Sequence, residues 1–268
     1  MRRRQLVEIE DLPWCPAAVR DGATDWLRFM ADTPGVYRLL APKLRAAMQA
    51  CGTSRIIDLC SGGGGPWRSL SAELQKSGPV EIVLSDLHPN MDAFGDAQRH
   101  GDGCITFEAR SIDAAHVPDD AIGMRTIFNA FHHFPPVVAR AILQDAIARR
   151  QGIAIFEGIN HRAAGIAAVV LQMPALFLFT PFIRPFRWSR LLFTYVLPLI
   201  PVVILWDGVV SMLRLYLRED VHELLQNVAG HDTFQWDIGT ATLGRIPLGM
   251  PCIIGVPRSE PSDSASPH

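Results

Sequence analysis

The residues best spaced for chemistry are aspartates that end apolar runs, and the first of them, Asp58, stands in the segment 55–66 (RIIDLCSGGGGP). An apolar run that becomes four glycines is typical of a buried parallel strand followed by a turn where the backbone approaches a ligand closely. Pro66 stands where a helix can begin, because its missing N–H is not needed there. A strand, a glycine turn and a helix N-terminus together predict a site for a polar or charged ligand.

Three kinds of nucleotide-binding loop could account for this turn. A phosphate-binding P-loop ends in Gly-Lys-Ser/Thr, which the segment lacks. A dinucleotide-binding loop needs G-x-G-x-x-G, and its third glycine would fall at Trp67 or Arg68, so this pattern fails as well. The segment resembles the third kind, motif I of the class I S-adenosylmethionine (SAM) methyltransferases, an acid-x-Gly-x-Gly-x-Gly loop. Asp58, Gly62 and Gly64 occupy its acid, second and third glycine positions.

Cys60 replaces the first glycine of that motif, and we interpret it as a small residue in a turn that does not need positive φ. An ordinary glycine turn in another α/β protein is the alternative interpretation. Asp86 ends the next apolar run, about 20 residues beyond the loop, where a carboxylate can accept hydrogen bonds from ribose hydroxyls. The resemblance implies that Asp86 is the motif II acid and that Asp113, after a third run, reads the adenine amino group. It extends the predicted cofactor site to Leu87, Ala114 and Asn129.

Each of these aspartates could instead be an ordinary loop acid or a helix cap. Three acids at strand ends, in register with one glycine loop, argue against that alternative.

Two adjacent histidines, His132 and His133, follow the predicted strand 126–131, at the edge where ligands bind in parallel α/β sheets. A methyltransferase aligns the nucleophile behind the methyl group and excludes water. An oxygen or nitrogen nucleophile often also needs a base, and histidine titrates near neutrality. We predict that one of the two is catalytic and expect them to point to opposite sides of an extended chain. In the structural alternative, one packs in the core and the other caps the helix near Pro135.

The same edge supplies the predicted acceptor pocket, which consists of Trp26, Phe131, Glu157 and His161. The segment 129–134 lacks the Asn-Pro-Pro-Tyr signature of many amino-group methyltransferases, which argues against amide or exocyclic amine acceptors. A metal site could be built from His132, His133, Glu157 and His161. These residues do not have the spacing of ligands on one helix, so we predict no metal.

Strand and helix patterns alternate between residues 55 and 160, which predicts an α/β fold with a doubly wound, mostly parallel, seven-stranded sheet. Short strands at 234–238 and 252–256 would close it as an antiparallel hairpin, as the resemblance implies. We divide the chain into an N-terminal helical segment (1–35), a SAM-binding Rossmann-like core (36–160), a hydrophobic helical insertion (161–215), a C-terminal helix and strand pair (216–257) and a disordered tail (258–268).

The insertion carries no acidic residue from Ala163 to Trp206, and its basic residues there are Arg184, Arg187 and Arg190. Two apolar runs flank these arginines, each broken by prolines and near the lower length limit for crossing a bilayer. We predict a hairpin that dips into one leaflet with the arginines near anionic head groups. A cap over the active site or a dimer interface is the alternative. Two full spans come last, because prolines leave carbonyls that lipid cannot satisfy.

The 268-residue chain has a net charge of −2, and this absence of basic excess argues against a nucleic-acid partner. Its five cysteines lack the C-x-x-C spacing of structural zinc, and we expect reduced thiols in the cytoplasm. We predict a cytoplasmic, membrane-associated methyltransferase that uses SAM to methylate a small or lipid-like apolar acceptor, with O-methylation preferred. There are two alternatives. One is an enzyme that binds SAM but catalyses cyclisation or decarboxylation, and the other is a membrane-bound SAM-binding module without turnover. The sequence determines neither the acceptor nor the oligomeric state.

Overall fold

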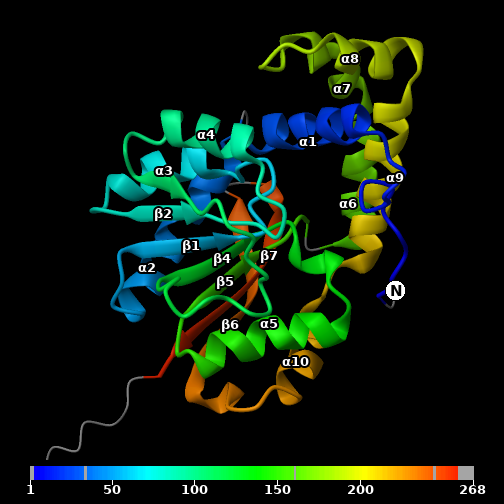
Figure 1. The fold of residues 1–268 in the computed structure, drawn as a ribbon. Coiled ribbons are helices and arrows are strands. Elements are labelled where there is room, and N and C mark those ends of the chain that lie inside the picture. The colour runs from blue at the N-terminus through cyan, green and yellow to red at the C-terminus, as the bar shows by residue number, and fades with distance from the viewer. Residues whose placement is uncertain (1–2, 33–34, 160, 244–245, 259–268) are drawn as a thin grey trace, which may run out of the picture.

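The computed structural model describes residues 3–32, 35–159, 161–243 and 246–258, and it contains a seven-stranded sheet of order β3-β2-β1-β4-β5-β7-β6 (Figure 1). The strands are β1 (Arg55–Leu59), β2 (Glu81–Leu84), β3 (Ile105–Phe107), β4 (Met124–Phe128), β5 (Ile153–Phe156), β6 (Phe234–Leu243) and β7 (Ile246–Pro257). The first five pair in parallel, and β7 runs antiparallel to both β5 and β6. The predicted fold class is confirmed, although β6 and β7 are longer than the strands expected at 234–238 and 252–256.

The helices stand between and after these strands. They are α1 (Ala17–Asp32), α2 (Ala41–Ala50), α3 (Trp67–Gln75), α4 (Met91–His100), α5 (Pro136–Ala148), α6 (Arg162–Leu171), α7 (Met173–Phe179), α8 (Trp188–Leu191), α9 (Leu199–Arg214) and α10 (Arg218–Gln226). Short helical turns are η1 (Val36–Leu40), η2 (Phe131–His133), η3 (Thr180–Phe182), η4 (Leu192–Val196) and η5 (His231–Thr233). Proline stands in the first turn of α2, α5 and α7, where a backbone N–H is not required.

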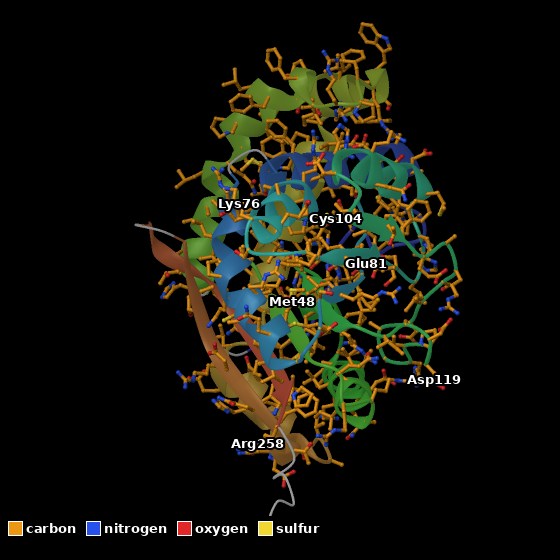
Figure 2. All side chains as sticks on the ribbon, turned by 90° about the vertical axis from the view of Figure 1, so that its left-hand side faces the viewer. Met48, Lys76, Glu81, Cys104, Asp119 and Arg258 are labelled. Atoms are coloured by element: carbon orange, nitrogen blue, oxygen red, sulfur yellow. The ribbon has the colours of Figure 1, made fainter. Side chains whose placement is uncertain are left out.

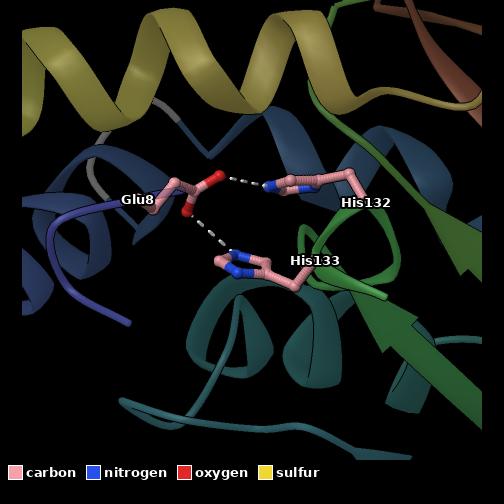
Figure 3. A group of neighbouring side chains, drawn as sticks. All are labelled: Glu8, His132 and His133. Atoms are coloured by element: carbon pink, nitrogen blue, oxygen red, sulfur yellow. Dashed lines mark ion pairs between the residues drawn. The ribbon is translucent and has the colours of Figure 1, made fainter. Parts of the chain in front are cut away.

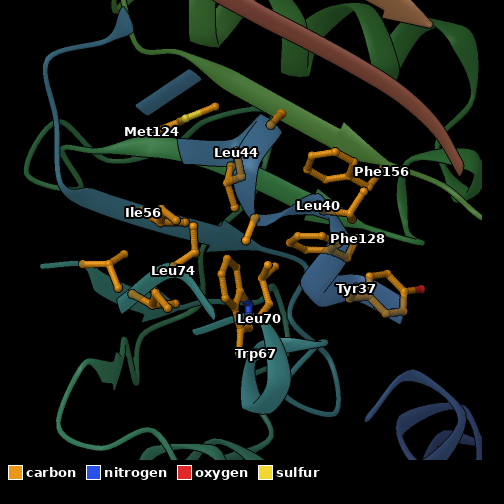
Figure 4. Packing of buried hydrophobic residues seen from close by; sticks show 14 of the residues in the cluster. Tyr37, Leu40, Leu44, Ile56, Trp67, Leu70, Leu74, Met124, Phe128 and Phe156 are labelled. Atoms are coloured by element: carbon orange, nitrogen blue, oxygen red, sulfur yellow. The ribbon is translucent and has the colours of Figure 1, made fainter. Parts of the chain in front are cut away.

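Both faces of the sheet are covered, since successive residues of each buried strand point to opposite sides. In β1, Ile56 joins the apolar cluster that η1, α2, α3 and α4 cover, whereas Ile57 joins the cluster under α5 and α10. Aromatic rings fill the first cluster near the carboxyl ends of the strands (Figure 4). The Phe128 ring there meets Trp67 edge-on at 5.3 Å and stacks on Phe156 at 5.2 Å between ring centroids. These packed rings fix the strand ends from which the site is built.

Helices α6 to α9 form the insertion, which rises beyond one end of the sheet with α1 across its base (Figures 1 and 2). Glycines let these helices approach closely. A Cβ added at Gly22 of α1 would lie 2.4 Å from Ile200 Cδ1 of α9, and one at Gly165 of α6 would lie 2.3 Å from Met212 Sδ. Trp26 packs with the apolar cluster between α1, α7 and α9 and is 0 % exposed.

The arginines of the insertion lie against α1, and the prediction that all three face lipid head groups is wrong. Arg190 is buried and pairs with Asp25, and it also donates to the carbonyl oxygens of Ile183 (2.6 Å) and Pro185 (2.8 Å). Arg187 pairs with Asp25 as well, at 3.5 Å. A buried guanidinium needs a carboxylate and further acceptors, and here α1 supplies the carboxylate and the insertion supplies the carbonyl oxygens. Only Arg184 of the three is exposed.

Candidate active site

The glycine loop after β1 is organised by Asp58, whose side chain is 1 % exposed. Its Oδ1 accepts a hydrogen bond from Thr126 Oγ1 at 2.6 Å, and its Oδ2 accepts one from Ser61 Oγ at 2.7 Å. Burial raises the pKa of Asp58 to about 6, while the hydrogen bonds from Thr126 and Ser61 oppose this rise. Asp58 therefore ties the loop to β1 and β4, and its contribution to a cofactor site is to position the loop.

The backbone of the loop is left-handed at several residues, and Cys60 is one of them with φ of +59°. The expectation that this position does not need positive φ is wrong. A non-glycine residue there carries steric strain that glycine would not. Gly62 (φ +48°) and Gly64 (φ +98°) need glycine for the same reason. A Cβ added at Gly62 would meet no atom within 4 Å, so open space lies over the loop where a ligand could approach the backbone.

Asp86 follows β2 and holds the loop from the other side. Its Oδ2 accepts a hydrogen bond from the Gly62 N–H at 2.9 Å, and its Oδ1 accepts one from the His88 N–H at 2.8 Å. Each carboxylate oxygen can accept a further bond, so the side chain can still receive hydroxyl donors. Leu87 beside it is half exposed. The strand-end acid and the glycine loop thus meet at the carboxyl edge of the sheet.

Asp113 lies on the adjoining loop. Its Oδ1 accepts a hydrogen bond from the Ala115 N–H at 2.8 Å, and its Oδ2 lies 3.2 Å from Nδ1 of His116. Asp113 is exposed, whereas Ala114 is buried. The arrangement is that of a loop acid with free acceptor capacity, and its predicted contact with adenine stays a prediction.

Asn129, at the end of β4, has φ of +50° and donates a hydrogen bond from its side chain to the hydroxyl of Tyr37. Asparagine tolerates this left-handed conformation better than most residues do. The side chain is exposed, and the bond to Tyr37 links the end of β4 to η1. Its predicted contact with the cofactor stays a prediction.

The two histidines lie on the short turn η2, and their ring centroids are 4.5 Å apart. The expectation that they point to opposite sides of an extended chain is wrong, because a 3₁₀ turn does not alternate its side chains as a strand does. His132 is 5 % exposed, and Glu157 holds it through two hydrogen bonds. Glu157 Oε1 accepts from the His132 N–H at 3.1 Å, and its Oε2 accepts from Nδ1 at 2.5 Å.

Glu8, which is 3 % exposed, faces both histidines, and the sequence analysis missed it (Figure 3). Its Oε1 lies 3.7 Å from His132 Nε2, and its Oε2 lies 3.3 Å from His133 Nε2. Arg214 of α9 pairs with Glu8 Oε1 at 3.1 Å. No motif marks Glu8, which stands in an irregular segment far from the histidines in sequence. An acidic stretch, Glu8 to Asp11, was the available signal.

Asp11 joins this group from the same segment. Its Oδ1 lies 3.4 Å from His133 Nδ1, and its Oδ2 lies 3.2 Å from Arg214 Nη1. The hydrogen bond with His133 lowers the pKa of Asp11 to about 2, so its carboxylate is charged at neutral pH. Burial would lower the pKa of His133, but the hydrogen bond with Asp11 and the charge of Glu8 raise it above its ordinary value.

The predicted acceptor pocket does not form as expected. Phe131 is 0 % exposed and packs against Tyr216 with ring centroids 5.3 Å apart, and Trp26 is equally buried. Neither side chain reaches a pocket surface in this conformation, because each fills an apolar core cluster. Glu157 is taken up by His132, and His161 caps α6 by accepting a hydrogen bond from the Ala164 N–H at 3.4 Å.

A cleft of about 1140 Å³ adjoins Gly62 and Gly63 of the loop. It lies between α1, α4 and the segment 182–187 of the insertion, which we call the elbow. Charged and polar groups predominate along it, among them Arg20, Arg28 and Arg68. The elbow and the glycine loop therefore line the same cleft.

No protein-family model matches the sequence, and the comparison with curated proteins gives no match. Solved structures do match the fold. The plantazolicin methyltransferase BpumL, solved with S-adenosylhomocysteine, aligns at a TM-score of 0.60 and 12 % identity over 93 % of this chain and 94 % of its own. A putative SAM-dependent methyltransferase from Methanococcus maripaludis aligns at 0.51 and 16 % identity, over 91 % and 94 % of the two chains.

The O-methyltransferase NcsB1 from neocarzinostatin biosynthesis, solved with SAM and 2-hydroxy-5-methyl naphthoic acid, aligns at a TM-score of 0.52 and 12 % identity. The alignment covers 90 % of this chain and 59 % of that one. The chain thus has the fold of the class I SAM-dependent methyltransferases, with the strand order and the antiparallel last strand that define it. At these identities the comparison establishes the fold alone.

Proposed function

We propose that this chain is a SAM-dependent methyltransferase. One observation carries the proposal: the carboxylate of Asp86 at the end of β2 accepts the Gly62 N–H of the left-handed loop after β1. This joins a ribose-binding acid to a ligand-binding loop at the carboxyl edge of the sheet, where open α/β sheets bind their ligands. The matching structures of BpumL and NcsB1, solved with S-adenosylhomocysteine and SAM, support the same cofactor.

The residues around the loop fit SAM in three respects. Space is open over Gly62, the oxygens of Asp86 retain acceptor capacity, and the exposed Asp113 offers a further acceptor. SAM would supply an activated methyl group, and the chain's part would be to align the acceptor and exclude water. We propose that one of His132 and His133 takes the proton of an oxygen nucleophile. His132 is the better candidate, because Glu157 holds its Nδ1–H and leaves Nε2 as the acceptor.

Calorimetric binding of SAM tests the cofactor assignment. The Asp86→Ala variant loses a charged hydrogen-bond acceptor worth ~1.5–3 kcal/mol per bond, so its SAM affinity should fall by roughly 10- to 150-fold. Asp232→Ala, at an exposed aspartate before β6, is the matched control and should bind SAM as the parent does. Unchanged affinity in Asp86→Ala would refute the role of Asp86, and tighter binding of NAD than of SAM would refute the cofactor.

We further propose a lipid-like acceptor with a polar reacting end and O-methylation as the preferred reaction. The elbow supports this class of acceptor, because most of its residues line the charged cleft beside the glycine loop and also belong to the apolar insertion. Incubation with labelled SAM and a hydrophobic metabolite extract distinguishes the possible activities. A methylated product supports the proposal, whereas an altered but unmethylated product indicates cyclisation or decarboxylation. No product indicates a binding module.

The acceptor class accords with attachment of the insertion to a cytoplasmic membrane surface, which we also propose. Most of the exposed large hydrophobic side chains of the described residues belong to the insertion, among them Leu178 (63 % exposed) and Trp188 (77 %). The segment Arg162–Phe182 is 21 residues long, its most apolar 18 residues have a mean hydropathy of 1.9, and only 17 % of that part is buried. The other run bends by 78° between Val196 and Leu199, which favours a monotopic hairpin over a second span.

Sedimentation with phosphatidylglycerol vesicles tests the attachment. Replacement of both Leu178 and Trp188 by serine removes the burial of two large side chains, each worth about 1.5–3 kcal/mol, and should weaken partitioning by at least tenfold. Val137→Ser, at a 69 % exposed valine of α5, is the control. Equal partitioning of all three proteins would contradict the proposal, as would a concentration-dependent dimer that the double variant abolishes, since the apolar face would then be a protein interface.

A further inference from the structure

We infer that Glu8, His132 and His133 form a binding site for a divalent transition-metal ion such as zinc. Their ligand atoms, one carboxylate oxygen and two imidazole nitrogens, all lie within 4.8 Å of one another (Figure 3). Two histidines and one carboxylate form the ligand set of catalytic zinc sites that keep an open position. The distance between Glu8 and His133 agrees with this set. Two ligands ~2.0–2.1 Å from a tetrahedral ion lie roughly 3.4 Å apart, and Glu8 Oε2 lies 3.3 Å from His133 Nε2.

The chain holds each ligand by its other polar atom, as metal sites do. Glu157 Oε2 accepts the proton of His132 Nδ1 at 2.5 Å, and Asp11 Oδ1 lies 3.4 Å from His133 Nδ1. On Glu8, Oε1 accepts from Ser211 Oγ at 3.0 Å and pairs with Arg214, while Oε2 faces His133. Among the described residues, Nε2 of each histidine and Oε2 of Glu8 are thus the atoms that no side chain outside these three residues holds.

His132 Nε2 supplies an independent sign of a missing partner. The residue is 5 % exposed, yet within the described chain this nitrogen has no hydrogen-bond partner, and Glu8 Oε1 lies too far from it at 3.7 Å. Leaving a buried polar atom unsatisfied costs about 1–3 kcal/mol, and a metal–nitrogen bond would satisfy it.

The charge of the cluster also fits a cation. Three carboxylates surround the imidazoles, those of Glu8, Asp11 and Glu157, and among the described residues Arg214 is the one guanidinium that pairs with them. Neutral imidazoles would leave two negative charges without a partner, and a divalent ion supplies that charge. Two protonated histidines would balance it as well, and this is the rival explanation.

The ligands of the site come from two distant parts of the chain, and α9 holds one of them in place. Glu8 lies in the N-terminal segment, which α9 holds through Asp207, whose oxygens accept the Ile9 and Glu10 N–H groups at 2.6 and 3.0 Å. The histidines lie on η2 beyond β4. The inference does not depend on the proposed function, but it alters that proposal in one respect. A metal ion would occupy the nitrogen assigned there as the base, and the ion in place of His132 would make a bound hydroxyl more acidic.

Metal binding by the full-length chain tests the inference without SAM or an acceptor. After chelation and equilibrium dialysis against zinc, elemental analysis should find one ion per chain. Cobalt should give the intense visible absorption of a four-coordinate ion without a thiolate charge-transfer band, which excludes binding by the five cysteines. Glu8→Gln and His132→Ala should each weaken zinc binding by more than ~100-fold, and Asp11→Asn by ~10–100-fold as an outer carboxylate.

His222→Ala, at an exposed histidine of α10, is the matched control and should bind zinc as the parent does. Calorimetric binding of SAM by each variant checks that it is folded, and failure of SAM binding in the parent would speak against the proposed function alone. If His132→Ala does not fold, Glu8→Gln, which keeps the shape of the side chain, carries the test. A parent that binds no zinc, or a Glu8→Gln variant that binds it undiminished, would overturn the inference and favour protonated histidines.

Discussion

Asp58 gives a prediction in which the structure sets both the sign and the size. Its carboxyl is 1 % exposed, and burial raises its pKa to about 6 from an ordinary value of 3.8. The folded protein therefore holds this proton more tightly than the unfolded chain does. Between pH 6 and pH 4 the folded state binds more protons at this site, so its contribution to the free energy of unfolding rises as the pH falls.

The magnitude follows from the difference between the two pKa values. Each pH unit over which the two states differ in protonation is worth 1.36 kcal/mol. Lowering the pH from 7.5 to 4.5 should thus raise the free energy of unfolding by about 2 kcal/mol through Asp58 alone. The Asp58→Asn variant keeps the size and the acceptor oxygen of the side chain but lacks the titration. The difference in stability between the parent and this variant should therefore shift by about 2 kcal/mol in favour of the parent over this range.

Urea unfolding of both proteins at several pH values measures that difference, and the subtraction cancels the titration of every other group. Asp232→Asn, at an exposed aspartate, is the control, and its difference from the parent should stay constant within about 0.5 kcal/mol. A difference between the parent and Asp58→Asn that does not vary with pH would refute the reasoning. Asp58 would then be hydrogen-bonded well enough in its charged form to offset its burial.

Three further predictions concern the loop, the elbow and the histidines. Cys60→Gly should relieve ~1–2 kcal/mol of left-handed backbone strain and cost ~0.5–1 kcal/mol of chain entropy, so its free energy of unfolding in urea should equal or exceed that of the parent. Cys60→Val should be the least stable of the three proteins, and a valine variant more stable than the parent would contradict this. Arg190→Ala should lower the free energy of unfolding by ~1.5–3 kcal/mol, because the Ile183 and Pro185 carbonyls lose their charged donor while Asp25 keeps Arg187 and Arg28. Exposed Arg184→Ala should change it by less than ~0.5 kcal/mol; equal losses would argue against the buried pair. His132→Ala should lower kcat/KM by ~10²–10⁴-fold with SAM affinity unchanged, and full activity would make its role structural.

The strands of the sheet and the glycine loop could be predicted from the amino-acid sequence. Strand periods, glycines and strand-end acids are local signals, since the backbone and its nearest neighbours impose them. The sequence therefore predicted that the segment 55–66 and Asp86 lie together. The structure confirms this contact, since the Gly62 N–H donates a hydrogen bond to Asp86 at 2.9 Å. The parallel direction of the first five strands could be predicted as well, because β-strands separated by helices have few ways to assemble.

The tertiary structure alone decided which side chains face one another. Glu8 reaches the histidines because the N-terminal segment runs along α9, and no local pattern near Glu8 or His132 encodes that contact. Arg190 was predicted to lie near lipid head groups. It is instead a buried partner of Asp25, because α1 places that carboxylate beside it. The positive φ of Cys60 was also not predicted from the sequence. Packing and long-range ion pairs select these conformations, and they depend on residues brought together only when the whole chain has folded.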